Sequence, residues 1–142
     1  MSVPEQGAIP TVARLMSPDP IVVRHDRPLS EAARLLKEHE ISGMPVIDGE
    51  GLLVGVVSES DLVRARASEY LWSRWDSLTV RQVMHSPVLT ADASMNVAEA
   101  AALMEQAHVH RLVVVGEDQQ TPIGVISTSD LVRSIVGEQA PG

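Results

Sequence analysis

Residues 55–64 read GVVSESDLVR and residues 124–133 read GVISTSDLVR, so one ten-residue segment occurs twice in this chain. Eight of its ten positions are identical, at an offset of 69 residues (124 minus 55). Further upstream, residues 29–33 (LSEAA) recur as residues 97–101 (VAEAA), at an offset of 68 (97 minus 29). Two matches in the same order and at nearly the same spacing indicate an internal duplication.

Both copies predict the same order of elements, β-α-β-β-α. Apolar residues recur at i, i+3, i+4 and i+7 from Leu29 and again from Val97, which predicts an amphipathic helix in each copy. A second helix is expected after the first serine of each repeated segment. The expected strands are residues 21–23, 44–47 and 52–57 in the first copy and residues 88–89, 112–115 and 123–126 in the second.

The size of one copy indicates how the two copies are arranged. A unit of some 55 residues would leave an apolar face of its sheet uncovered and would be marginal alone. We therefore expect an α/β fold in which two tandem β-α-β-β-α units pack sheet to sheet with pseudo-two-fold symmetry. The expected division is an N-terminal extension at 1–11, a first domain at 12–66, a linker at 67–78, a second domain at 79–138 and a C-terminal tail at 139–142.

Composition narrows the classes of function. The chain has 11 Lys and Arg against 19 Asp and Glu, and this net charge of −8 disfavours nucleic acid as a partner. One Tyr and two Trp offer little surface for stacking bases, and the absence of Cys excludes disulfides and thiolate chemistry. No apolar run approaches the ~20 residues of a membrane helix, and no signal-peptide pattern is present. We expect a cytoplasmic protein without a membrane partner.

With these elements in place, the chain resembles a tandem pair of CBS (cystathionine-β-synthase-type) domains, also called a Bateman module. The resemblance covers roughly residues 12–136 and departs at Val113, where the family usually has the proline seen at Pro45. It is carried by MSP at 16–18, EAA at 31–33, ISGMPVID at 41–48 and GVVSESD at 55–61, and by EAA at 99–101, HRLVVV at 110–115 and GVISTSD at 124–130.

The resemblance implies a compact disc with two clefts. In that family the clefts bind AMP, ADP or ATP, and in some members S-adenosylmethionine or NAD. The resemblance further implies a homodimer and a regulatory role towards another protein. We expect no required cofactor. We therefore expect a stand-alone module that binds an adenosyl ligand and signals to an unidentified protein target.

Ser58 with Asp61, and Ser127 with Asp130, are the main candidate ligand-binding residues. Each serine lies where a strand gives way to a helix, and the free N–H groups of a helix start favour phosphate. A carboxylate only accepts hydrogen bonds and can take both ribose hydroxyls, the role that the resemblance assigns to the aspartates. The alternative is a plain capping box, which begins a helix without any ligand.

Four cationic or imidazole side chains are candidate phosphate partners: Arg111, His110, Arg64 and Arg133. Arg111 precedes a strand, and its fork of donors suits phosphate oxygens. The first copy has Gly43 at the equivalent position, so we expect unequal clefts with the second better suited to a polyphosphate. For Arg64 and Arg133, a solvated helix face is an equal alternative.

An adenine slot must be apolar. Val23, Met44, Pro45 and Leu89 are its candidate lining, and ordinary core is the alternative for each. The aromatic residues Tyr70, Trp72 and Trp75 fall in the linker, where we expect them to pack against the module or across a dimer, a docking patch being the alternative.

Catalytic and metal sites are not expected. His108 and His110 form a pair in an extended segment, but no third metal ligand is evident nearby, and His85 is expected at the surface. The sequence offers no nucleophile with a base and no paired carboxylates in distinct settings. The alternative to ligand sensing is therefore a non-catalytic structural or interaction module with vestigial clefts.

Overall fold

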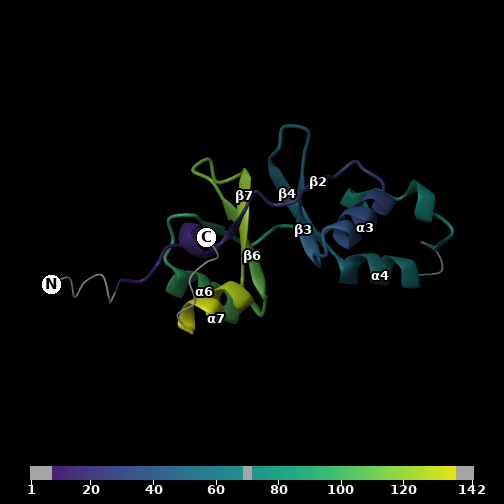
Figure 1. Cartoon of the computed structure of the whole chain (residues 1–142). Helices are drawn as coiled ribbons and strands as arrows, with labels where there is room; N and C mark the ends of the chain where they lie inside the picture. The colour runs from purple at the N-terminus through teal and green to yellow at the C-terminus, as the bar shows by residue number, and fades with distance from the viewer. Residues whose placement is uncertain (1–7, 69–71, 137–142) are drawn as a thin grey trace. The chain divides into compact units, whose positions relative to one another are not determined.

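The computed structural model describes residues 8–68 and 72–136 (Figure 1). Two compact α/β units divide the chain, and each is described by itself. The first-copy unit comprises residues 20–88, and the second-copy unit comprises residues 8–19 together with 89–136. Tyr70 and the expected tail 139–142 lie outside the described residues.

The first-copy unit contains a three-stranded sheet in the order β2-β3-β4. Strand β2 is parallel to β3, and β3 is antiparallel to β4. The elements are β2 (Val23–Arg24), α3 (Leu29–Glu38), β3 (Gly43–Ile47), β4 (Leu53–Ser58) and α4 (Glu59–Ala67), followed by the short 3-10 helices η1 (Trp75–Ser77) and η2 (Val80–Gln82).

The second-copy unit contains a four-stranded sheet in the order β1-β7-β6-β5. Its helices α6 and α7 contact one another and the neighbouring strands (Figure 1). The elements are α2 (Val12–Leu15), β1 (Ser17–Pro18), β5 (Thr90–Asp92), α6 (Val97–Ala107), β6 (Arg111–Val115), β7 (Pro122–Ser127) and α7 (Thr128–Ile135).

The expected β-α-β-β-α order and the mixed α/β class are confirmed in both copies. Each helix buries the apolar stripe that its spacing predicts: Leu29, Ala32 and Leu36 in α3, and the three equivalent residues in α6. These residues belong to two separate core clusters, one in each unit. The repeated apolar pattern therefore builds two cores of the same design.

The first strand of each copy was expected too early in the chain. Strand β5 starts at Thr90, not at residue 88, and β2 extends only over Val23 and Arg24. In β5, Thr90 pairs with Val113, but its counterpart Val22 is outside β2, opposite Pro45. Because proline has no N–H to donate, the first-copy ladder is one residue shorter.

The glycine that opens each repeated segment is needed because another stretch of chain crosses it. A Cβ on Gly124 would lie 2.5 Å from Met16 Sδ and 2.9 Å from the backbone oxygen of Ser17. A Cβ on Gly55 would meet Met84 and the backbone oxygen of His85 at the same two distances. Thus the segment that leads each copy packs on the strand of the other copy's repeated motif.

We predict that Gly124→Ala lowers the free energy of unfolding by about 1–3 kcal/mol, the usual cost of overpacking. The added methyl must displace Met16 or the backbone at Ser17. Urea denaturation measures the change. Gly116→Ala is the matched control, because its Cβ would make only ordinary contacts, at 3.5 Å with Ile123 and at 3.9 Å with Asp118. Equal midpoints for the two variants would contradict the prediction.

Candidate functional site

Each repeated segment forms a capping box at the start of a helix. The Asp61 carboxylate accepts hydrogen bonds at Oδ2 from the Ser58 backbone N–H (2.8 Å) and hydroxyl (3.0 Å). The Asp61 N–H in turn donates to Ser58 Oγ at 3.3 Å. Ser127 and Asp130 repeat this arrangement with the same three distances. The capping-box interpretation is therefore confirmed in both copies.

The two capping aspartates are buried. Asp61 is 1% exposed and Asp130 is 6% exposed, and each receives an arginine from one turn further along its own helix. Arg64 Nη1 lies 3.0 Å from Asp61 Oδ1, and Arg133 Nη2 lies 2.6 Å from Asp130 Oδ1. A buried carboxylate needs such a partner, because an unpaired charge in the interior is costly.

These contacts show where the two arginine side chains lie. Arg64 and Arg133 keep large exposed fractions, but both guanidinium groups are fixed on the aspartates rather than lying free on a solvated helix face. The donors not used by the carboxylate remain available to solvent, since a guanidinium carries five. Each copy thus presents a carboxylate and a guanidinium together at one helix start.

His85 distinguishes the first-copy site. Its Nε2 contacts Asp61 Oδ1, beside Arg64. His85 is held there by its backbone, which donates to the Val56 oxygen at 2.8 Å and accepts from the Val56 N–H at 3.0 Å. The expectation of a surface histidine was incomplete: the side chain is 65% exposed, yet its ring nitrogen reaches a buried carboxylate.

Arg111 distinguishes the second-copy site. It is the first residue of β6 and lies directly opposite Ser127 in β7, as Gly43 lies opposite Ser58 in the first copy. Directly opposed residues project from the same face of a sheet. The exposed side chain of Arg111 therefore projects from a position beside the start of α7. The first copy has a glycine, and so no side chain, at that position.

The four candidate adenine residues lie in three different settings. Val23 and Met44 are members of the first-copy core, which supports the ordinary-core alternative for both. Pro45 is buried on the other face of β3, because side chains alternate along a strand. Leu89 is exposed and precedes β5.

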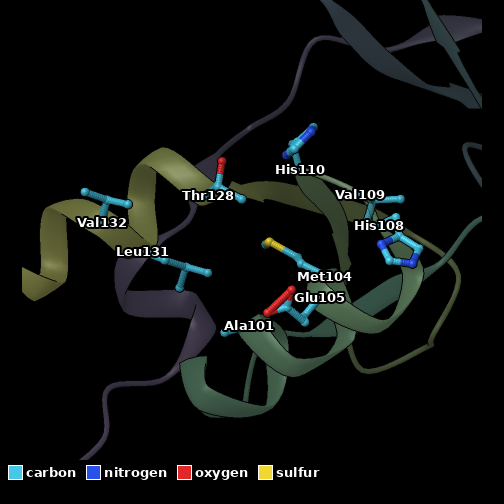
Figure 2. Close-up of a pocket in the computed structure, with 9 residues that line it drawn as sticks. All are labelled: Ala101, Met104, Glu105, His108, Val109, His110, Thr128, Leu131 and Val132. Atoms are coloured by element: carbon cyan, nitrogen blue, oxygen red, sulfur yellow. The ribbon is translucent and has the colours of Figure 1, made fainter.

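A pocket of about 430 Å³ lies in the second-copy unit (Figure 2). Of the candidate ligand residues His110 is part of its wall, whereas Ser127, Asp130, Arg111 and Arg133 are not. The pocket is bounded by one face of α7, by α6 and by the loop that joins α6 to β6. Its lining residues are Ala101, Met104, Glu105, His108, Val109, His110, Thr128, Leu131 and Val132.

Two smaller expectations concern metals and the linker. Within residues 8–68 and 72–136, no cluster of three His, Cys, Asp or Glu side chains could hold a metal ion.

In the linker, the Arg66 guanidinium carbon lies 3.5 Å from the Trp72 ring centroid and 4.6 Å from that of Trp75. Trp75 also packs against the first-copy core. The linker indoles are therefore in contact with the end of α4, as packing of the linker predicts.

The duplicated α/β units, each with a capped aspartate at a helix start, define a tandem pair of related domains. Residues 12–68 and 80–137 match the model of the CBS domain, and the chain belongs to the CBS domain family. The part of the chain that the structure describes contains no helix of the length and hydropathy needed to span a membrane.

Two relatives illustrate the settings in which this domain pair occurs. An uncharacterized protein of Methanocaldococcus jannaschii is 30% identical, over 82% of this chain and 86% of its own length. The L-aspartate semialdehyde sulfurtransferase of the same organism is 26% identical over 96% of this chain, but the match spans only 25% of that enzyme.

Three solved structures share the fold and contain adenosyl ligands. CBSX2 from Arabidopsis thaliana, in complex with AMP, has a TM-score of 0.78 and 31% identity, covering 89% of this chain and 96% of that one. A CBS domain pair with 5′-methylthioadenosine and S-adenosyl-L-methionine has a TM-score of 0.79 and 27% identity, covering 92% and 98%. The CBS domain of a bacterial CNNM/CorC-family Mg²⁺ transporter, in complex with ATP, has a TM-score of 0.76 and 25% identity, covering 91% and 89%.

We predict that Ser127→Ala lowers the free energy of unfolding by about 1 kcal/mol, because the cap at the start of α7 is lost. Thermal or urea denaturation followed by circular dichroism measures the change. Ser129→Ala is the control, since Ser129 is exposed two residues further along and alanine is a good helix former. A Ser127 variant as stable as the Ser129 variant would show that the cap is not a stabilising contact.

Proposed function

We propose that this CBS domain pair is a regulatory module that binds adenosyl ligands of the AMP, ADP or ATP class at the starts of α4 and α7. The observation that carries the proposal is the doubled buried carboxylate, held at a helix N-terminus beside an arginine. A fixed acceptor suits a ribose hydroxyl, and the helix start together with a guanidinium suits a phosphate. The AMP, ATP and S-adenosylmethionine complexes of its structural relatives support the same class of ligand.

Arg111 favours the second-copy site for a phosphorylated ligand. It adds an exposed guanidinium beside Ser127, where the first copy has Gly43. S-adenosylmethionine carries the same ribose but no phosphate. Arg111 therefore favours it less than it favours AMP, ADP, ATP or NAD, which carry phosphate groups. The bound ligand is released unchanged, and the module signals its ligand-bound state to a partner protein in the cytoplasm.

The test is calorimetric titration with AMP, ADP, ATP, S-adenosylmethionine and NAD. We expect Asp130→Asn to weaken AMP binding by roughly 10- to 150-fold, because a hydrogen bond to a charged group is worth about 1.5–3 kcal/mol. Wild-type protein should lose a similar factor towards 2′,3′-dideoxy-AMP, and the variant should lose little more. An equal loss on both proteins would show that the aspartate and the ribose do not interact.

Wild-type protein that binds none of these ligands would overturn the proposal and favour a structural or interaction module with vestigial clefts. The complete capping box is the observation that supports this second candidate, since the box is satisfied without any ligand. Chromatographic analysis of ATP after incubation with the protein provides the check on release without turnover.

We further propose that the module is a homodimer that buries the exposed apolar side chains of α4 and α7, the second helix of each repeat. Val63 in α4 and its repeat counterpart Val132 in α7 are both exposed, and Ile135 is 80% exposed. Removing such side chains from water favours association. The repetition of the exposed valine in both copies supports a common role in the assembly.

Val132→Asp should shift the protein from dimer to monomer, because a carboxylate is costly to bury in an interface. Size-exclusion chromatography with light scattering reports the mass. As the control, Ala102→Asp places the same charge at an exposed position of another helix, α6, and should leave the mass unchanged. A wild-type monomer, or a dimer in the Val132 variant, would contradict this assembly.

A further inference from the structure

The carboxylate of Asp61 is saturated with hydrogen-bond donors. An ionised carboxylate offers about four lone-pair positions. In Asp61, Oδ2 accepts from the Ser58 N–H and hydroxyl, and Oδ1 accepts from Arg64 and contacts His85 Nε2. No acceptor position is left for a further donor such as a ribose hydroxyl.

The carboxylate of Asp130 keeps one acceptor position open. Its Oδ2 accepts from the Ser127 N–H and hydroxyl, and its Oδ1 accepts from Arg133. Among the described residues, these three donors are the complete set for Asp130. The two sites share one design and differ by a single donor, which is the imidazole of His85.

The difference arises from one position in the two leading segments. His85 and Ser17 are equivalent at an offset of 68 (85 minus 17). His85 bridges to Val56 in β4, and Ser17 pairs with Val125 in β7, 69 residues beyond Val56 (125 minus 56). The backbones are thus in the same register, but only a histidine side chain is long enough to reach the aspartate.

We propose that His85 is an internal competitor for the ribose hydroxyl at the first-copy site and so determines the order in which the two sites fill. The inference rests on the proposed function. A ligand reaches Asp130 without displacing any protein group, whereas at Asp61 it must first displace the imidazole. His85 can yield, because its side chain is 65% exposed while its backbone stays paired with Val56.

The experiment exchanges the two residues. His85→Ser is measured in an Asp130→Asn background, which reports the first-copy site, and Ser17→His in an Asp61→Asn background, which reports the second-copy site. Calorimetric titration with AMP should show roughly tenfold tighter binding for His85→Ser and roughly tenfold weaker binding for Ser17→His, the factor expected for one hydrogen bond to a charged group. His39→Ser, which removes an exposed histidine from the end of α3, is the matched control and should have no effect.

A second ligand separates competition for the ribose from a change in charge. The gain from His85→Ser should vanish with 2′,3′-dideoxy-AMP, which has no hydroxyl to offer the freed oxygen. A gain of equal size with both ligands, unchanged affinity in both exchanges, or weaker binding of AMP by His85→Ser would overturn the inference and leave the proposed function standing. No binding of AMP by the wild type or by either exchange would overturn both the inference and the proposed function.

Discussion

Both units depend on one interaction, the closure of a buried aspartate onto the serine that begins its helix. This interaction lies where a strand ends and a helix starts, and it holds a charged group in the interior. Most residue types in the repeated segment can be explained by their contacts around it. The opening glycine admits the crossing methionine, the serine and aspartate make the cap, and the arginine compensates the charge. The leucine that follows the aspartate joins or contacts the core. Local geometry therefore accounts for five of the eight identical positions, namely the glycine, the capping serine, the aspartate, the leucine and the arginine.

The cap and the proposed ligand site use different oxygens of the same carboxylate. The capping bonds end on Oδ2 in both copies, and the arginine lies on Oδ1. A ribose hydroxyl at Oδ1 would leave the helix cap intact, so the structural and the ligand-binding interpretations are compatible. The capping bonds also hold the acceptor oxygen in place before any ligand arrives. This lowers the loss of conformational entropy on binding.

Features set by neighbouring residues could be predicted from the sequence, and features set by pairing partners could not. Both second helices start where the Ser-x-x-Asp spacing places them, because a cap needs only four consecutive residues. The starts of β2 and β5 depend on whether Pro45 or Val113 lies opposite, and that requires the register of the sheet. In the sequence, nothing distinguishes His85 from other surface histidines. Only its backbone bridge to Val56, which the structure shows, places its ring beside Asp61. Met44 and Val23 suit an adenine slot by composition, and the structure shows that both are members of the first-copy core.

The segment that leads each repeat packs in the unit of the other repeat, so the surroundings of the duplicated motif can differ between the two copies. Residues 79–88 belong to the first-copy unit, and residues 12–19 belong to the second. In the proposed sites, His85 and Arg111 would act in different copies and on different parts of a nucleotide. His85 occupies an acceptor that a ribose would use, and Arg111 adds a donor that a phosphate would use. In the proposed sites both differences favour the second copy, although the motif itself is nearly identical in the two.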